Sequence, residues 1–263
     1  MTVNVIEFEN VSLVRGGVRI LDDISVKISK GESVAVIGPN GSGKSSMMKI
    51  LKGDARPYSD ENKRTVCRLF GKERWNIFDL RKMIGVVSTE LQSRFDPAAT
   101  VADVILSGFF RTADIYKYHD VTDDMVAAAE EAAARTGIAD KLARESGKLS
   151  LGEMRRALIA RALAPDPRML LLDEPMTGLD IVAKDKLRVM LDALIKKGTA
   201  VVMITHDLSD IPNGVERIIM MKDGRIFGDG KKKDVLTSGT MSELYSSPLT
   251  VSENNGTYSV AQP

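Results

Sequence analysis

One stretch of the sequence has the residue types and the spacing of a phosphate-binding loop. Gly38 to Ser45 fits the pattern G-x-x-x-x-G-K-[ST]. Glycines let backbone N–H groups converge on phosphate oxygens, and the helix that follows adds the positive end of its dipole. We expect Lys44 to reach the β- and γ-phosphates of a nucleotide and the Ser45 hydroxyl to hold Mg²⁺. The residues predicted to contact the nucleotide here are Gly38, Pro39, Asn40, Gly41, Ser42, Gly43, Lys44, Ser45 and Ser46.

Two acidic residues follow an apolar run later in the chain. Met169 to Leu172 predicts a buried strand, and Asp173 at its end can reach the metal. Glu174 comes one residue later, where a carboxylate can orient or deprotonate the attacking water. The alternative is a buried strand that surfaces into two solvated acids. The phosphate-binding loop upstream favours the catalytic interpretation.

A third segment combines a helix cap with a site for an anion. Ser150 and Glu153 have the spacing of a capping box, so one interpretation is a well-capped helix from Ser150 to Leu163. Its free N-terminus, with a serine hydroxyl and the flexible Gly152, is equally suited to an anion. This segment belongs to a different region of the chain from Gly38–Ser45. If both segments bind the same phosphate chain, the simplest explanation is that they come from two different subunits.

One of the two histidines has a position that suggests chemistry. His206 follows a strand predicted over 199–205 and stands at its carboxyl end, the edge where α/β sheets place ligands. There it could hydrogen-bond a γ-phosphate, although a single histidine taken alone is more often structural. His119 lies in a tyrosine-flanked stretch without a motif, and we interpret it as structural.

The elements that position these residues predict an α/β fold. A nearly continuous apolar run over 33–37 leads into the loop and a helix over 45–51 follows it, which is the order such a loop requires. Further buried strands are predicted over 169–172 and 199–204, with an amphipathic helix from about Ile181 to Lys197 between them. We therefore predict a P-loop nucleoside-triphosphatase core with a mostly parallel sheet.

Other segments surround this core. Short strands over 5–8 and 21–28 flank the Gly16-Gly17 turn and predict an N-terminal antiparallel β subdomain. Residues from about 95 to 165 predict an inserted, mainly helical subdomain. Within it, we expect Asp123 to cap an alanine-rich helix.

The chain is expected to form one large domain with a short appendage. We assign residues 1–247 to the domain and residues 248–263 to a C-terminal hairpin or tail. The hairpin is predicted because strand-like alternation occurs on both sides of Asn255-Gly256, a pair that favours a type I′ turn. The run Lys231-Lys232-Lys233 is interpreted as a solvated loop, with contact to an anionic surface as the alternative.

The composition argues against several classes of protein. The 263 residues include 37 basic and 36 acidic side chains, a balance that gives no support to a nucleic-acid partner. The single cysteine, Cys67, excludes an internal disulfide, suits a reducing compartment and is interpreted as a small buried hydrophobe. No apolar run approaches the ~18–20 residues that span a bilayer. We expect a cytoplasmic protein without direct membrane insertion, which reaches the inner face of the membrane only through a partner.

The order of these motifs resembles that of the ATP-binding-cassette (ABC) family, and the likeness covers nearly the whole chain. Gly38–Ser45 is similar to the family's Walker A loop, Leu149–Glu153 to its signature motif, and Leu170–Glu174 to Walker B with the catalytic glutamate. Thr177–Asp180 resembles the D-loop, and His206 the switch histidine. Because the motifs follow in the family's order, the resemblance is specific.

The resemblance implies an ATPase that hydrolyses ATP with Mg²⁺ and drives a membrane transporter. Such cassettes pair head to tail, with ATP between the Walker A loop of one subunit and the signature of the other. The implied partners are a second copy of the chain and membrane permease subunits. The residues implied at ATP on the signature side are Ser150, Gly152, Glu153 and Asp180, and those implied in catalysis are Lys44, Glu174 and His206.

The chain departs from the family pattern in the signature and at the adenine site. Leu151 stands where the family usually has glycine, and Glu153 where it often has glutamine. Ser150 and Gly152 survive, so we expect the phosphate contact to persist. The aromatic residue that usually stacks on adenine falls near Arg15, whose planar guanidinium can stack on a base instead.

The family's glutamine loop is also altered. Ser88–Leu91 stands where the glutamine would normally come, and Gln92 lies about three residues late. We assign the metal-binding role to Gln92, with Glu90 and Thr89 as alternatives. This loop, together with Asp223–Ile226 and the predicted hairpin, looks most like prokaryotic importers of the molybdate and iron-siderophore type.

Two other functions stay open at this point. A soluble single cassette of iron–sulfur assembly or repair would carry the same motifs without a membrane partner. The other is a nucleotide-dependent binding module without turnover, and the intact Lys44, Asp173, Glu174 and His206 argue against it.

Overall fold

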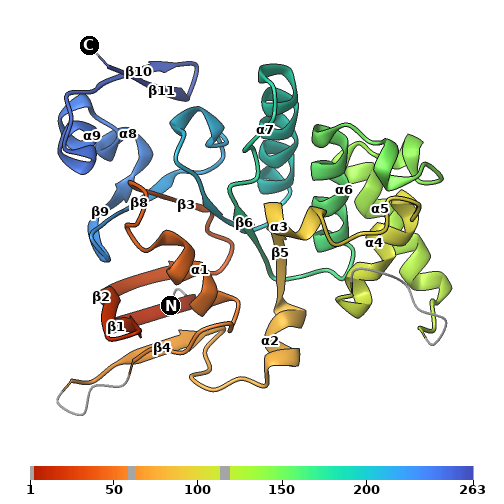
Figure 1. The fold of residues 1–263 in the computed structure, drawn as a ribbon, viewed down its shortest axis with the longest axis horizontal. Coiled ribbons are helices and arrows are strands. Elements are labelled where there is room, and N and C mark those ends of the chain that lie inside the picture. Colours follow the sequence, from red (N-terminus) through yellow and green to blue (C-terminus); the bar gives the residue numbers. More distant parts are fainter. Residues whose placement is uncertain (1–2, 59–62, 113–118, 263) are drawn as a thin grey trace. The chain divides into compact units, whose positions relative to one another are not determined.

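The structure, a computed structural model, describes residues 3–58, 63–112 and 119–262 (Figure 1). The chain divides into two compact units, of which the first contains residues 1–81 and 200–263 and the second residues 82–199. The architecture is α/β, with a mostly parallel sheet and a separate antiparallel β subdomain. The predicted fold class is therefore confirmed.

An antiparallel sheet begins the first unit. It consists of β1 (Asn4–Arg15) between β2 (Val18–Ser29) and β4 (Val66–Leu69). Gly16 and Gly17 both have positive φ in the β1–β2 turn, a backbone conformation that glycine adopts without steric cost. Burial alternates along β2, so one face of this strand packs into the core while the other meets solvent.

Parallel strands of the first unit surround β3 (Val34–Ile37). This strand lies between β7 (Val201–Ile204) and β8 (Arg217–Lys222), and β9 (Arg225–Lys231) pairs with β8 in the antiparallel direction. Every residue of β3 and β7 is buried, which explains why their sequences are apolar without alternation. The glycine-rich loop then leads from β3 into α1 (Lys44–Leu51).

The C-terminal part of the first unit adds two short helices and a hairpin. In chain order these elements are α8 (Lys232–Val235), α9 (Ser238–Tyr245), β10 (Thr250–Asn254) and β11 (Thr257–Ala261). Asn255 and Gly256 between the two strands both have positive φ, as a type I′ turn requires. β11 packs against η3 (Leu208–Asp210), a 3-10 helix that follows β7.

The second unit combines two parallel strands with helices. β5 (Ile84–Ser88) pairs with β6 (Met169–Asp173), and their register places Ser88 beside Asp173. In sequence, α2 (Ile77–Met83) bridges the boundary between the units. The remaining helices are α3 (Thr89–Gln92), α4 (Val101–Phe110), α5 (Asp123–Thr136), η1 (Ala139–Lys141), η2 (Ser146–Lys148), α6 (Leu151–Leu163) and α7 (Ile181–Lys196). Of these, α4, α5 and α6 pack against one another.

The cap of α5 differs from the prediction. Thr122, and not Asp123, is the N-cap, since its hydroxyl oxygen accepts a hydrogen bond from the N–H of Met125 at 3.3 Å. Asp123 is the first helical residue, where its negative charge still favours the positive end of the helix dipole. At the other end, Gly137 has positive φ and terminates the helix.

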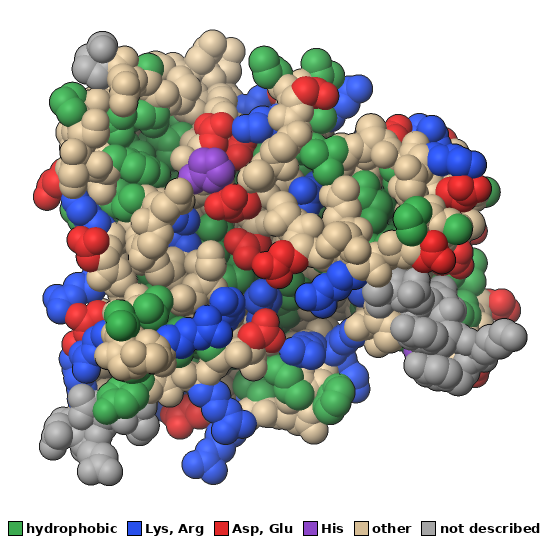
Figure 2. All heavy atoms as spheres, in the orientation of Figure 1, with side chains coloured by type: hydrophobic (Ala, Val, Ile, Leu, Met, Phe, Trp, Pro, Cys, Tyr) green, Lys and Arg blue, Asp and Glu red, His purple; other side chains and the backbone are tan. Residues whose placement is uncertain are grey.

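Two properties of the described residues relate to the expectations drawn from the composition. Side chains of both charge signs are exposed across the face that Figure 2 shows. No helix in residues 3–58, 63–112 and 119–262 combines the length and the apolar character needed to cross a membrane.

The interpretation of Cys67 as a buried residue is only partly correct, because its side chain is of intermediate exposure. Its partial burial raises the pKa of the thiol to about 11, so that the group is protonated at neutral pH.

Candidate active site

The glycine-rich loop holds a buried ammonium group. Lys44 is the first residue of α1 and is only 6% exposed. Its Nζ donates hydrogen bonds to the carbonyl oxygens of Gly38 at 2.7 Å and Pro39 at 2.9 Å, so the side chain folds back along the loop. An ammonium group beside neutral carbonyls attracts an anion, because a full negative charge interacts more strongly than a dipole. Lys44 therefore fits the phosphates of a nucleotide.

Further donors in the same loop suit a phosphate chain. The Ser42 hydroxyl is buried and has no hydrogen-bond partner among the described residues, a condition that costs about 1–3 kcal/mol. α1 begins without a side-chain cap, so that N–H groups of its first turn are available to phosphate oxygens. The donor set of the loop thus fits the triphosphate of ATP.

The shape of the loop depends on the neighbouring β8–β9 turn. A Cβ atom on Gly38 would lie 2.1 Å from the carbonyl oxygen of Met221, and the φ of 150° at Gly38 is itself unfavourable for other residues. The N–H of Gly224 donates a hydrogen bond to the carbonyl oxygen of Ser42 at 3.2 Å. β8 and the turn after it therefore contact the loop at its first residue and at its middle.

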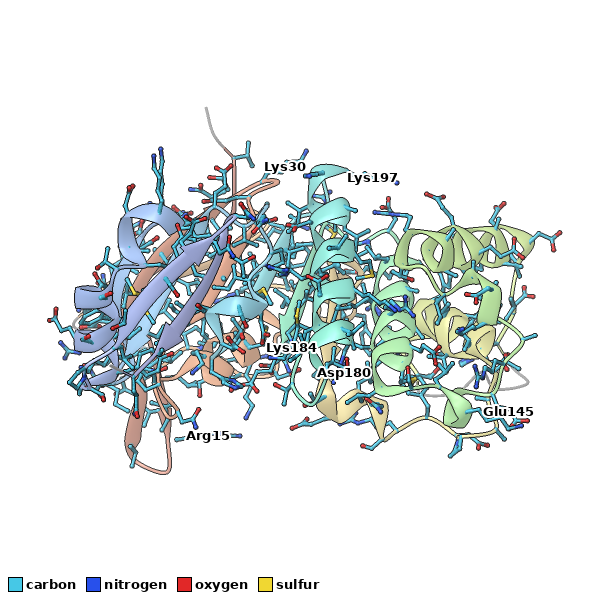
Figure 3. The ribbon with its side chains drawn as sticks, turned by 90° about the horizontal axis from the view of Figure 1, so that it is seen from above. Arg15, Lys30, Glu145, Asp180, Lys184 and Lys197 are labelled. Atoms are coloured by element: carbon cyan, nitrogen blue, oxygen red, sulfur yellow. The ribbon has the colours of Figure 1, made fainter. Side chains whose placement is uncertain are left out.

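The remaining nucleotide candidates of the first unit differ in position. Asn40 and Ser45 are exposed and Ser46 is partly exposed, and all three are continuous with the loop. Arg15 is instead the exposed last residue of β1, beside the β1–β2 turn (Figure 3). The structure thus joins the loop residues in one site by chain continuity and places Arg15 on a separate hairpin. The adenine-stacking role of Arg15 stays a prediction.

His206 stands at the carboxyl end of β7, on a turn that is held from both sides. The buried Thr205 donates its hydroxyl to the Asp210 carboxylate at 3.1 Å. The same hydroxyl oxygen accepts the N–H of Asp207 at 3.1 Å, and Asp207 in turn caps η3. His206 itself is exposed, so its ring is accessible to a ligand while its backbone is fixed.

The two carboxylates of the second unit follow one another at the end of β6. Asp173 ends the strand beside Ser88, and Glu174 has a φ of 47°, which is uncommon for a residue with a side chain. Such backbone conformations persist where the surrounding structure enforces them, frequently at functional sites. The Thr177 hydroxyl donates a hydrogen bond to Oε2 of Glu174 at 3.1 Å and orients the carboxylate.

The altered glutamine loop forms the short helix α3 directly after β5. Thr89 and Glu90 are exposed in its first turn, and the partly exposed Gln92 is its last residue. All three candidates follow the end of β5. Ser88 at this end lies beside Asp173, the predicted metal ligand at the end of β6. The metal-binding role of Gln92 therefore stays a prediction, with Glu90 and Thr89 as its alternatives.

The N-terminus of α6 is capped as the sequence predicts. Oγ of Ser150 accepts the N–H of Glu153 at 3.3 Å, and the Glu153 carboxylate accepts the N–H of Ser150 at 2.8 Å. This backbone hydrogen bond lowers the pKa of Glu153, and Lys141, whose Nζ lies 3.2 Å from Oε1, lowers it further. The Glu153 carboxylate thus interacts with groups of the protein itself. Because the Ser150 oxygen acts as an acceptor in the cap, its hydroxyl proton can be donated to an anion.

The predicted signature and D-loop residues lie together around one cavity. Asp180 caps α7 by accepting the N–H of Ala183 at 2.8 Å, and Figure 3 shows it at the end of the helix opposite to Lys197. A cavity of about 210 Å³ is lined by Ser150, Gly152, Glu153, Arg156, Asp180, Val182, Ala183, Lys186 and Leu187. Two helix N-termini and the cations Arg156 and Lys186 therefore meet the carboxylates of Glu153 and Asp180 here, so charges of both signs line the cavity.

Several residues of these sites were not predicted. Lys141 pairs with Glu153 from another helix, and no pattern in the sequence relates the two. Arg156 and Lys186 come together only through the packing of α6 and α7. Thr177 is the exception, because its place three residues after Glu174 within a tight turn is a signal for a side-chain contact.

The loop, the strand-end carboxylates and the capped α6 define a P-loop protein of the nucleotide-binding ATPase class. A family model described as ABC transporter matches residues 21–177. The chain therefore belongs to the ABC transporter ATP-binding proteins, a family of ATPases.

Individual relatives agree with this assignment. An uncharacterized ABC transporter ATP-binding protein of Bacillus subtilis, YlmA, is 33% identical over 94% of this chain and 93% of its own. The hemin import ATP-binding protein HmuV of Escherichia coli O157:H7 is 31% identical over 92% and 93%. Among solved structures, cbiO1 from Clostridium perfringens, part of the ABC transporter complex cbiONQ, matches with a TM-score of 0.78 and 26% identity, covering 91% of this chain and 93% of that one.

Proposed function

We propose that this chain is a Mg²⁺-dependent ATPase subunit that pairs head to tail with a second copy and drives an importer-type transporter. The observation that carries the proposal is the loop from Gly38 to Ser45, where the Lys44 ammonium and the Ser42 hydroxyl fit a triphosphate. The proposed partners beyond the second copy are membrane-spanning permease subunits.

The loop residues bind and orient ATP in this proposal. Backbone N–H groups from Gly41 to Ser46 hold the phosphates, and Lys44 exchanges its two carbonyl partners for phosphate oxygens. Its positive charge then offsets the negative charge that develops on the transferred phosphoryl group. Arg15 is proposed to stack on the adenine.

Two side chains are proposed to act on the attacking water and the γ-phosphate. Glu174 accepts the water proton at its carboxylate, which Thr177 holds in one orientation. His206 donates a hydrogen bond to the γ-phosphate. Ser45, Asp173 and Gln92 are the proposed holders of Mg²⁺, an ion that prefers such oxygen ligands and neutralises phosphate charge.

The signature side of ATP is proposed to come from the second copy. Ser150 and Gly152 line one cavity with the cations Arg156 and Lys186 and the carboxylates Glu153 and Asp180. Within this mixed lining, the Ser150 hydroxyl and the N-terminus of α6 are the groups proposed to meet an anion that another subunit presents. Leu151, the departure from the family's glycine, is partly exposed next to the cap. The capping box keeps the N-terminus of α6 in place despite this substitution.

Import is proposed from the relatives. HmuV is a hemin import protein and cbiO1 is part of the cbiONQ complex, and both match more than nine-tenths of this chain. We propose that the choice of substrate lies in the membrane partners.

The proposal predicts that Glu174→Gln binds ATP but loses turnover, so that a dimer accumulates with ATP and Mg²⁺ in size-exclusion chromatography. Glu145→Gln is the matched control, because Glu145 is an exposed carboxylate whose ion pair with Lys148 contributes little. Retained steady-state hydrolysis in Glu174→Gln would refute the assignment of the base. Purification from membranes with a polytopic protein supports transport, whereas recovery with soluble scaffold proteins would favour iron–sulfur assembly.

A further inference from the structure

A second cavity lies in the first unit, beneath the C-terminal hairpin. It measures about 370 Å³ and shares no residue with the loop from Gly38 to Ser45. Three segments form it: the turn before β8, the junction of β9 with α8, and the hairpin. Its lining residues are Asn213, Val215, Glu216, Lys231, Lys232, Lys233, Gly256 and Tyr258.

The lining is cationic, and one of its lysines is buried. Lys231-Lys232-Lys233 was predicted to be a solvated loop, but Lys231 ends β9 and Lys232 is only 7% exposed at the start of α8. Nζ of Lys232 donates to the carbonyl oxygen of Pro212 at 3.3 Å and lies 5.3 Å from the ring centre of Tyr258. The prediction was therefore wrong for the middle lysine, which the hairpin covers.

The charge of the cavity favours a small anion. Glu216 is the only carboxylate among its lining residues, against three ammonium groups. Within the described part of the chain, Lys231 and Lys233 form no ion pair. Ammonium groups that face a common space repel one another, and an anion between them removes this repulsion.

Contacts at the β10–β11 turn hold the hairpin over this cavity. Nδ2 of Asn213 donates a hydrogen bond to the carbonyl oxygen of Asn255 at 3.3 Å. A Cβ atom on Gly256 would lie 3.0 Å from Oδ1 of the same asparagine, so the turn lies directly on it. These contacts at the turn therefore fix the position of Tyr258 above the lysines, and the hairpin forms one wall of the cavity.

We propose that this cavity is a regulatory site for a small oxyanion, either free inorganic phosphate or the phosphate group of a small metabolite. Lysine ammonium groups bind such ions as point charges, without the planar geometry that an arginine pair would impose. The volume is at the lower end of the range of small-ligand sites, which suits a phosphate with a small substituent.

The site is connected to the segment that carries His206. Pro212 contacts Lys232 and Asn213 contacts the hairpin. Only Ile211 separates these two residues from η3, which begins two residues after His206. β11 also packs against η3. An anion that attracts the Lys232 ammonium breaks its hydrogen bond to the Pro212 carbonyl oxygen. It therefore acts on the segment that follows His206 in the chain. The effect on ATP turnover rests on the proposed function, whereas anion binding does not.

The binding test uses the full chain with Lys44→Ala, which removes phosphate binding at the loop. Titration with inorganic phosphate in a calorimeter is expected to give saturable heat that sodium chloride at equal ionic strength does not reproduce. Adding Lys231→Gln and Lys233→Gln, both exposed positions, is expected to weaken the affinity at least about tenfold. Lys30→Gln, an exposed lysine elsewhere in the first unit (Figure 3), is the control and leaves the affinity unchanged.

Three outcomes would overturn parts of the proposal. Equal heat with chloride, or an affinity that the double lysine variant does not change, would remove the site. Titration with glycerol 2-phosphate distinguishes free phosphate from a metabolite as the ligand. A site for a metabolite binds this ester at least as tightly as free phosphate, whereas a site for the free ion does not bind it. Turnover in the otherwise native chain is then compared with and without the tighter ligand. An unchanged rate would remove the link to His206, and an inactive native chain would count against the proposed function alone.

Discussion

The hydrogen bond between Thr177 and Glu174 makes the sharpest prediction about catalysis. Thr177→Val replaces the hydroxyl by a methyl group of similar size and removes the 3.1 Å bond to Oε2 of Glu174. The side chain of Glu174 then samples other rotamers, and only a fraction of molecules present the carboxylate to the water. The expected loss is therefore in kcat, while the KM for ATP changes little.

The size of this loss follows from the exposure of the bond. A hydrogen bond to a charged group contributes about 1.5–3 kcal/mol when water is excluded. Thr177 is exposed and Glu174 partly exposed, so a smaller value of about 0.5–1.5 kcal/mol is appropriate. Since 1.36 kcal/mol corresponds to a factor of ten, kcat should fall about 2- to 13-fold.

The assay is steady-state phosphate release over a range of ATP concentrations, fitted for kcat and KM separately. Thr177→Ser keeps the hydroxyl and is expected to retain a kcat close to that of the native chain. If Thr177→Val turned over at the native rate, or if the serine variant were equally slow, the positioning role of Thr177 would be refuted.

Three further predictions concern stability and reactivity. Gly38→Ala should lower the free energy of unfolding by about 1–3 kcal/mol in urea titrations, because its Cβ would lie 2.1 Å from the Met221 carbonyl oxygen. Gly239→Ala should not, because its Cβ would make only an ordinary contact with Oγ1 of Thr237 at 4.0 Å, and equal stability of the two variants would contradict the steric argument. The pKa of Glu153 lies below its ordinary value of 4.5 in the folded chain, so its stabilisation is complete above that value and is lost as the pH falls through the folded pKa. Glu153→Gln should remove this part of the acid dependence in unfolding curves measured from pH 6 downward, and identical curves would show that the cap does not titrate. With the pKa of its thiol at about 11, Cys67 should react slowly with iodoacetamide at pH 8 and rapidly in denaturant, as followed by mass spectrometry. Fast alkylation of the native chain would contradict the raised pKa.

Local signals predicted much of the fold. The capping box of Ser150 and Glu153 is confirmed, because both partners lie within one turn and the geometry depends on few residues. The turn at Asn255-Gly256 could be predicted for the same reason, since both positions need positive φ. The misplaced cap of α5 is a local error of one residue: Thr122 and Asp123 are both good caps, and the sequence alone does not choose between them.

Contacts between distant segments could not be predicted. The burial of Lys232 depends on a hairpin more than twenty residues later that folds back over it, and neighbouring lysines in a row normally indicate solvent. The pairing of Lys141 with Glu153 likewise depends on how η1 packs near α6. Periodicity reports which face of an element is buried, but it carries no information on which element covers that face.

The contact between Gly38 and Met221 has a consequence for protein engineering. The loop from Gly38 to Ser45 takes its conformation partly from the β8–β9 turn, which lies more than 170 residues away in sequence and donates the Gly224 N–H to Ser42. A peptide with the loop sequence, or a graft of it onto another strand and helix, would lack this external template. A phosphate-binding module transplanted from this chain would therefore need at least the β8–β9 hairpin in addition to the loop, β3 and α1.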